Sequence, residues 1–211
     1  MTKQGFPQTE TIEQLMRLIT ILMAISLFIP SYRARAQEYL SEQEIDQIRE
    51  AQSIDQRTKA FIYIADRRLR VLTEANPTQS KKDEEKWGPM PKGAPAQMLI
   101  GYKRAINELM DKLEDNFERE KSNEALGKAL RALAEALDRQ LKVLESLQSK
   151  FTDEAELAAL TDAVAVAKVA KEGALENAAL IEEEEKAKKE ALKKEKEKKK
   201  DKKPLPALSP V

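Results

Sequence analysis

Residues 126–147 read LGKALRALAEALDRQLKVLESL and place a leucine at every third or fourth position. This spacing brings the leucines to one side of an α-helix. The other positions are mainly alanine and charged residues, so the helix has one apolar seam along a polar rod. Such a seam is buried only against another apolar surface, which predicts an all-α, antiparallel helical bundle similar to a coiled coil. The seam consists of Leu126, Leu130, Leu133, Leu137, Leu141, Leu144 and Leu147.

A second seam precedes the first, in a helix that we expect over residues 96–120. Only the short connection from Glu120 to Glu124 separates the two helices, so we expect them to pack against each other in antiparallel orientation. The predicted bundle covers residues 96–185. The seams can also close between chains, which would give a homo-oligomer. This second seam consists of Leu99, Tyr102, Ile106, Leu109, Leu113 and Phe117.

Residues 37–75 carry the signals of an N-terminal helix pair. Ser41 and Glu44 have the spacing of a capping box, in which the two side chains satisfy each other's backbone N–H groups. This predicts the start of the first helix of the pair. Ile45 and Ile48 would form its buried side.

The second helix of the pair has the same start signal, with Ser53 and Gln56 three residues apart. It is expected to end at Asn76-Pro77, because the residue before a proline resists helical dihedral angles. Its apolar stripe is broad enough to face a core and contains Phe61, Ile62, Ile64, Ala65, Leu69 and Leu72.

Residues 76–95 form a predicted Pro/Gly-containing linker. They hold four prolines and two glycines, a composition typical of a connection. They also hold Trp87, the single tryptophan of the chain. Two interpretations stay open for Trp87: it covers the end of the bundle or lies in a mobile linker, or it anchors a binding partner.

The last helix is predicted to start at Thr152-Asp153-Glu154, where a capping side chain and acidic residues lie beside the positive end of the helix dipole. It is expected to continue as a charged helix towards Lys203. Pro204 and Pro206 forbid continuation, so residues 186–211 become a Lys-rich helical extension and a disordered tail. The predicted seam contains Leu157, Leu160, Val164, Ala167, Ala170 and Leu175.

Beyond Ile181 the last helix has no apolar stripe, and glutamate precedes lysine by four residues in five pairs. This orientation stabilises a solvated helix by about 0.2–0.5 kcal/mol per pair. Residues 186–203 have a net charge of +7, whereas residues 37–185 have a net charge of −9. The pairs are Glu182 with Lys186, Glu184 with Lys188, Glu185 with Lys189, Glu190 with Lys194, and Glu195 with Lys199.

The chain has 37 basic and 37 acidic residues but no histidine and no cysteine. Their absence removes the commonest general base, the thiolate nucleophile, haem ligation and every His or Cys zinc site. No phosphate-binding loop, dinucleotide fingerprint or EF-hand loop occurs. We therefore expect no enzymatic activity, no catalytic or metal-binding residue and no cofactor.

Residues 18–30 are an uncharged, apolar run of 13 residues, too short to cross a bilayer core that needs about 20. The run suits the centre of a signal peptide over residues 1–36, with small residues Ala34 and Ala36 before a cleavage site at Gln37. An uncleaved anchor or a buried N-terminal helix is the alternative. Translation can start at Met1 or Met16. The prediction is export to the periplasm or the exterior, with no transmembrane helix in the mature chain.

Arg67, Arg68 and Arg70 form a basic cluster on the second helix. Arginine can grip a carboxylate or a phosphate, so the cluster is a candidate anion contact. The alternative is solvation or pairing within the bundle, with Asp66 and Glu74 as nearby partners.

The segment Glu44-Ile45-Asp46-Gln47-Ile48-Arg49-Glu50-Ala51-Gln52, followed by Ala65-Asp66-Arg67-Arg68-Leu69, resembles the opening of a family of uncharacterised, exported, all-helical proteins of environmental bacteria. The resemblance implies export and an all-helical fold. It implies no activity and no site residue.

These features predict an exported structural or interaction protein of the cell envelope, with the Lys-rich end as an arm for electrostatic contacts. The expected partner is an unidentified protein, anionic lipid or anionic envelope polymer. Export and the lack of interleaved aromatic residues argue against nucleic acid. The alternative is a periplasmic holdase-type chaperone.

Overall fold

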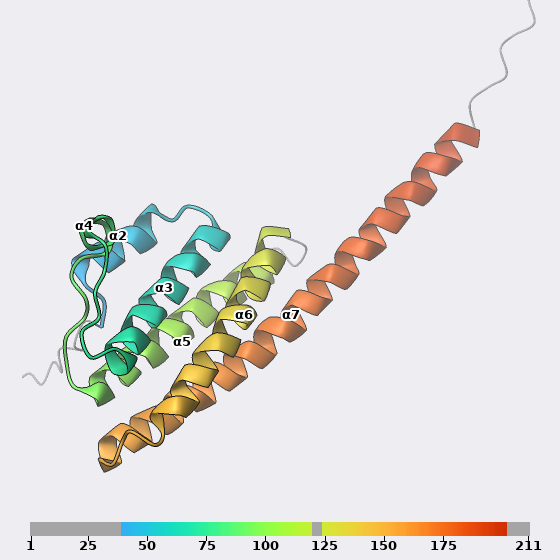
Figure 1. Ribbon diagram of the computed structural model, residues 1–211. Helices are drawn as coiled ribbons and strands as arrows, with labels where there is room; N and C mark the ends of the chain where they lie inside the picture. The colour runs from blue at the N-terminus through green and yellow to red at the C-terminus, as the bar shows by residue number, and fades with distance from the viewer. Residues whose placement is uncertain (1–38, 120–123, 202–211) are drawn as a thin grey trace, which may run out of the picture. The chain divides into compact units, whose positions relative to one another are not determined.

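The computed structural model describes residues 39–119 and 124–201, with backbone alone for the last seven. The predicted signal peptide, its cleavage site at Ala34, Ala36 and Gln37, and the predicted tail lie outside these residues. The described part of the chain is all-helical (Figure 1). Its helices are α2 (Glu42–Glu50), α3 (Ile54–Thr73), α4 (Lys81–Trp87), α5 (Pro95–Arg119), α6 (Glu124–Leu147) and α7 (Glu154–Asp201).

Four long helices, α3, α5, α7 and α6, pack side by side in that order as a bundle. Adjacent α3 and α5 run in opposite directions, as do α6 and α7 (Figure 1). Contacts along α6 and α7 follow this direction, since Asp138 pairs with Lys171 while the earlier Arg131 lies 4.0 Å from the later Glu182. The predicted all-α bundle is therefore confirmed, and antiparallel packing holds for these two pairs. The other neighbouring pairs, α3 with α6 and α5 with α7, run parallel (Figure 1).

The expected packing of α5 directly against α6 is wrong. These consecutive helices share few contacts, because α5 packs between α3 and α7, and α6 packs on the other side between the same two helices. The two helices thus lie on a diagonal of the bundle. The short connection keeps α5 and α6 close together at one end. Each of the two apolar seams, however, packs mainly against α3 and α7.

The leucine seam of α6 is buried along its whole length, as predicted. On α5 the predicted seam is buried from Leu99 to Leu113, whereas Phe117 is only half-buried near the helix end. These leucines and α3 residues such as Phe61 and Ile64 form one core in the middle of the four helices.

The buried seam of α7 differs from the prediction because it consists mainly of alanine. Leu157 and Leu175 were expected in this seam but are exposed, and Val164 is half-buried. Small side chains on α7 accommodate the large leucines of α6 and allow the helices to approach closely. A Cβ atom on Gly127 of α6 would lie 3.2 Å from Cγ2 of Ile181. The seam is Leu160, Ala163, Ala167, Ala170, Ala174, Ala178 and Ile181.

Both predicted capping boxes of the N-terminal helix pair are present. The backbone N–H of Glu44 donates to the Ser41 hydroxyl at 3.2 Å, and Gln56 and Ser53 repeat the arrangement. The prediction for the buried side of α2 is only partly confirmed, however. Glu44 is its most buried residue, while Ile45 and Ile48 are only half-buried.

The predicted linker over residues 76–95 contains a helix, α4, which the sequence interpretation missed. Its start is capped by Ser80, whose hydroxyl accepts from the backbone N–H of Asp83 at 3.1 Å. The prolines and glycines that suggested a connection lie before and after this short helix.

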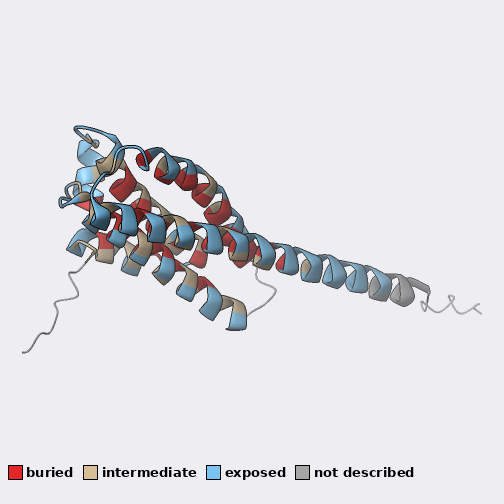
Figure 2. Cartoon of the chain, turned by 90° about the horizontal axis from the view of Figure 1, so that it is seen from below, coloured by how far each residue is buried: buried red, intermediate tan, exposed pale blue. Residues whose placement is uncertain are grey.

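Helix α7 extends beyond the other helices of the bundle. It is one continuous helix of 48 residues, about 70 Å long, and Gly173 does not interrupt it. Asp153 caps its start by accepting from the backbone N–H groups of Ala155 and Glu156. Residues 182–194 are exposed apart from the half-buried Glu185 (Figure 2), and we call the Lys-rich residues 186–194 the arm.

The burial pattern predicts a large difference between two identical substitutions. Leu133→Ala in the core of α6 should lower the free energy of unfolding by about 2–5 kcal/mol, because it leaves a cavity among fixed neighbours. Leu192→Ala in the arm, where the side chain is 56% exposed, should change it by less than about 0.5 kcal/mol. Urea denaturation of both variants measures the difference, and similar losses would contradict the described packing.

Candidate functional site

A buried ion pair joins α2 to α3. The Glu44 carboxylate accepts from Arg67 Nη1 at 2.8 Å and from Arg68 Nη2 at 3.0 Å, and the three side chains are at most 2% exposed. The same carboxylate accepts from the backbone N–H of Ser41 at 3.0 Å, which completes the capping box. Glu44 therefore caps the start of α2 and is the shared counter-ion of two buried arginines.

Arg67 also holds the end of α4. Its Nη1 donates to the carbonyl oxygen of Trp87 at 2.8 Å, and its Nη2 donates to those of Gly88 and Pro89 at 2.9 and 2.5 Å. Burial lowers the pKa of the guanidinium, while Glu44 opposes this shift. Because α2 and α4 both bind this one side chain, Arg67 sets their positions on α3.

The structure divides the predicted basic cluster. Arg67 and Arg68 pair within the bundle with Glu44, a partner that the sequence did not indicate. Arg70 lies near the surface and pairs with the predicted Glu74 at 3.1 Å. Asp66, the other predicted partner, instead accepts from Gln140. With Arg67 and Arg68 almost fully buried, an outside anion could reach only Arg70 without local opening.

Trp87 is 7% exposed and packs within its own chain. Its ring centroid lies 4.6 Å from that of Tyr63, and Lys86 Nζ lies 5.4 Å from the Trp87 ring. Gly88 follows at a φ of 73°, a conformation that favours glycine. The turn lets the chain leave α4 against α2, where a Cβ on Gly88 would meet Gln43 Oε1 at 2.9 Å.

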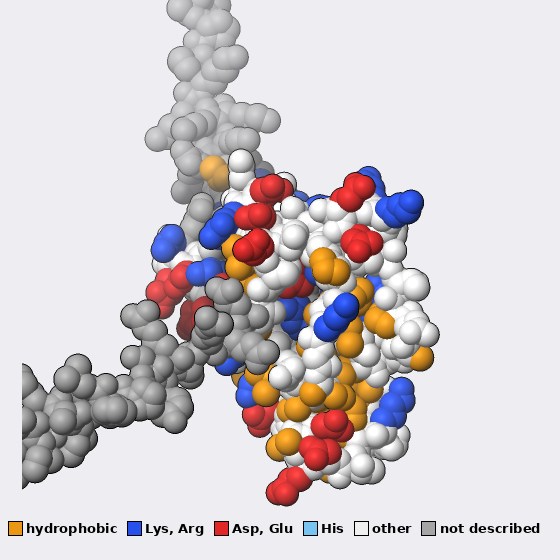
Figure 3. Space-filling model, turned by 90° about the vertical axis from the view of Figure 1, so that its left-hand side faces the viewer, with side chains coloured by type: hydrophobic (Ala, Val, Ile, Leu, Met, Phe, Trp, Pro, Cys, Tyr) orange, Lys and Arg blue, Asp and Glu red, His pale blue; other side chains and the backbone are white. Residues whose placement is uncertain are grey.

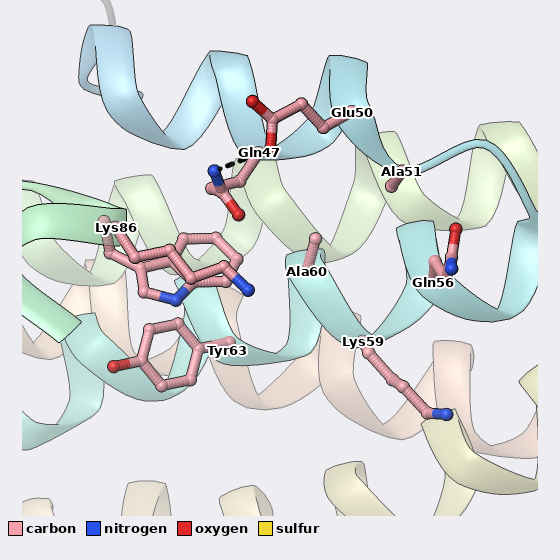
Figure 4. A pocket seen from close by; sticks show the side chains of 9 residues that line it. Gln47, Glu50, Ala51, Gln56, Lys59, Ala60, Tyr63 and Lys86 are labelled. Carbon is pink, nitrogen blue, oxygen red and sulfur yellow. Dashed lines mark hydrogen bonds between the residues drawn. The ribbon is translucent and has the colours of Figure 1, made fainter. Parts of the chain in front are cut away.

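A groove opens between α2, α3 and α4, and we call it the α3 groove. Its volume is about 480 Å³, within the usual range for ligand sites. Gln47 and Glu50 lie on the α2 side, joined by a hydrogen bond of 3.2 Å, with Ala60 and Tyr63 on α3 opposite them (Figure 4). The lining residues are Gln47, Glu50, Ala51, Gln56, Lys59, Ala60, Tyr63, Lys86 and Trp87.

The α3 groove combines apolar surface with charges of both signs. Burial, followed by the nearby Asp83, raises the pKa of the Tyr63 hydroxyl above its usual value. On the molecular face in Figure 3, acidic and basic side chains are likewise interspersed around hydrophobic ones. Within residues 39–119 and 124–201 no group of acidic side chains has the arrangement of a metal site.

A chain of polar side chains crosses the core close to this groove. The Tyr102 hydroxyl donates to Gln140 Oε1 at 3.0 Å, and Gln140 Nε2 donates to Asp66 Oδ1 at 2.7 Å. Burial raises the pKa of Asp66, and the Gln140 hydrogen bond and Arg139 oppose this shift. Burial also raises the pKa of Tyr102, with Asp66 as a lesser cause. The network satisfies polar groups that link α5, α6 and α3.

The arm is the second candidate site. Two of the predicted glutamate–lysine pairs form salt bridges, Glu182 with Lys186 at 2.9 Å and Glu185 with Lys189 at 3.7 Å. The hydrogen bond from Lys186 lowers the pKa of Glu182. These contacts support the helix locally and leave the lysines at the surface.

Comparison of the chain with models of protein families, with characterised proteins and with solved structures finds no match. The resemblance of residues 44–52 and 65–69 to exported helical proteins therefore stays a prediction. None of the helices in the described ranges is both long and apolar enough to span a bilayer.

The buried ion pair predicts a strong effect of Glu44→Gln. The substitution leaves two buried guanidinium groups without their counter-ion, so the free energy of unfolding should fall by about 3–5 kcal/mol. Glu74→Gln is the matched control, because it breaks an exposed pair with Arg70 worth less than about 1 kcal/mol. Urea denaturation followed by Trp87 fluorescence measures both. Equal effects would show that Glu44 does not hold α2 and α4 on α3.

The raised pKa of Asp66 predicts a pH-dependent effect of Asp66→Asn. The folded state binds the Asp66 proton more tightly than the unfolded state does, so this group favours folding at low pH. That contribution is lost as the pH rises from the pKa of 3.8 in the unfolded state through the raised pKa in the folded state. Asp66→Asn should therefore stabilise the protein at pH 7, and the gain should vanish below about pH 3.8. Thermal unfolding at both pH values tests this, and destabilisation at pH 7 would contradict it.

Proposed function

We propose that this protein is an exported interaction protein of the cell envelope, in which the four-helix bundle is a platform and the arm makes electrostatic contacts. The observation that carries the proposal is the contrast between the two parts of α7. Up to Ile181 the helix buries an alanine seam, and beyond it the described side chains bury almost nothing.

The arm is rich in positive charge. Five lysines and one glutamate lie in residues 186–194, and all are exposed. The longer stretch to residue 203 has a net charge of +7, opposite to the net charge of −9 over residues 37–185. A basic rod on an acidic body attracts polyanions at its end while the body repels them.

An anionic lipid surface or an anionic envelope polymer is the partner that we favour. Lysine ammonium groups bind dispersed negative charge without a fixed geometry. The arm has no apolar face for insertion into a membrane, so the contact is peripheral and sensitive to salt. The envelope location rests on the predicted signal peptide in residues 1–36.

A holdase-type chaperone is the second candidate, because α7 exposes several large apolar side chains. Val169 is 70% exposed and Leu180 is 45% exposed, and they project to the same side of the helix. Leu175 and Leu192 project to other sides, so these residues do not form one patch that could shelter a client. For this reason we favour the interaction protein.

The proposed role of the arm predicts a charge-specific loss of binding. Replacing five arm lysines by glutamine keeps a helix-forming residue but removes five charges, so sedimentation with anionic vesicles or isolated cell-wall material should fall at least tenfold at low salt. In 1 M NaCl, where the screening length is about 3 Å, the unmodified protein should also dissociate. The substituted residues are Lys186, Lys188, Lys189, Lys193 and Lys194.

A control variant replaces five exposed lysines outside the arm by glutamine, so its net charge equals that of the arm variant. It should keep most of the binding. Equal losses of binding in both variants would show that only the overall charge of the protein matters, which contradicts a specific role of the arm. Unchanged binding of the arm variant would also overturn the proposal. The control positions are Lys81, Lys82, Lys92, Lys150 and Lys168.

A further inference from the structure

We propose that the α3 groove binds an uncharged oligosaccharide chain. This binding site is independent of the arm and of the proposed function. Three features of the groove favour this ligand: its shape, its mixture of hydrogen-bonding groups and its continuation across α3.

The groove is preformed because its walls are fixed. Helix α2 forms one wall and is held at its first turn by Glu44, through Arg67 and Arg68. The end of α4 forms another wall and is held by the same Arg67. The lining also contains Ala51 at the end of α2 and Ala60 on α3, whose small side chains leave the space between the helices open.

The polar groups of the groove include both donors and acceptors. Lys59 and Lys86 donate, Glu50 accepts, and the amide of Gln47 does both. A sugar hydroxyl is a donor and an acceptor, so it can use all of these groups. A polyanion would be attracted by the two lysines but repelled by Glu50. Beside these groups, Trp87 covers part of the half-buried Tyr63 ring, and the remainder of this ring offers apolar surface for the C–H face of a sugar.

The surface continues from this groove over α3. Lys59 and Tyr63 also line a second hollow of about 300 Å³ between α3 and α6, which holds Asp66, Glu135 and Arg139. Taken together, the two hollows contain three basic and three acidic side chains. Their charges balance, so the combined surface selects neither a polyanion nor a polycation. Its extent across one helix fits a chain of several sugar units.

A peptide is less well matched to this surface. An extended peptide is usually bound by adding a strand to a sheet edge, and the described residues contain no strand. A Pro-rich peptide docks in aromatic grooves, but here Lys86 lies over the Trp87 ring and competes for it. Peptide binding is therefore an outcome that the experiment must distinguish.

The test titrates the full chain with neutral tetrasaccharides of different linkage, and Trp87 fluorescence reports binding because this single tryptophan lines the groove. We expect a saturable change with at least one of them. Tyr63→Leu should weaken binding about tenfold by removing the aromatic face. Gln47→Ala should weaken it severalfold by removing an amide. Gln148→Ala, the same substitution at an exposed position outside the groove, should have no effect.

Absence of a saturable response to every neutral tetrasaccharide would overturn the proposal. The same conclusion would follow if Tyr63→Leu and Gln47→Ala bound as tightly as the unmodified chain, or if only a Pro-rich peptide or an oligouronate bound. Circular dichroism shows whether each variant is folded. If Tyr63→Leu is unfolded, the binding of Gln47→Ala alone tests the proposal. The arm variant with five lysine substitutions should bind sugar normally. The sugar-binding proposal can therefore fail without affecting the proposed role of the arm, and the reverse also holds.

Discussion

Packing of the α6 leucines against the α7 alanines is the contact on which the rest of the bundle depends. This pair has the most extensive helix contact in the molecule as described. Large side chains on one helix and small ones on the other let the two axes approach closely, with Gly127 against Ile181 near the end of the contact. Helix α6 then presents its remaining apolar surface to α3, and α7 presents its own to α5. The other two long helices close the bundle on the opposite side.

The N-terminal elements depend on a different interaction. Helices α2 and α4 are short and bury few apolar side chains, so the hydrophobic effect alone determines their placement poorly. Arg67 determines the positions of both helices, because a buried guanidinium needs hydrogen-bond acceptors. Its acceptors are Glu44 and the carbonyl oxygens at the end of α4. The α3 groove exists because this polar contact holds two helices over α3 while small residues leave space beneath them.

The bundle and the arm differ in what stabilises the helix. Within the bundle α7 is helical because its alanine seam is buried. Beyond Ile181 the support is local, from glutamate–lysine pairs such as Glu182 with Lys186 and from lysines near the negative end of the helix dipole. Removal of charge from the arm therefore acts on contacts outside the molecule and leaves the core unchanged.

Local signals predicted much of the structure. The serine caps at Ser41 and Ser53 start helices where expected, and the α6 seam is buried at every leucine. The candidate groove was not predicted, because its residues come from three helices and one of these, α4, looked like a linker. A signal for the buried ion pair was nevertheless present, since Glu44 lies on the face of α2 that the two isoleucines were expected to bury.

The sequence by itself determined where most helices start and end, which side of α5 and α6 is apolar, and where positive charge accumulates, because these properties depend on residues within a few turns of one another. Only the tertiary structure decided that α5 and α6 lie on a diagonal, that alanines rather than Leu157 and Leu175 face the core, and that Glu44 meets Arg67. Several arrangements bury the same seams. The choice among them depends on the fit of side-chain volumes and the pairing of buried charges between distant segments.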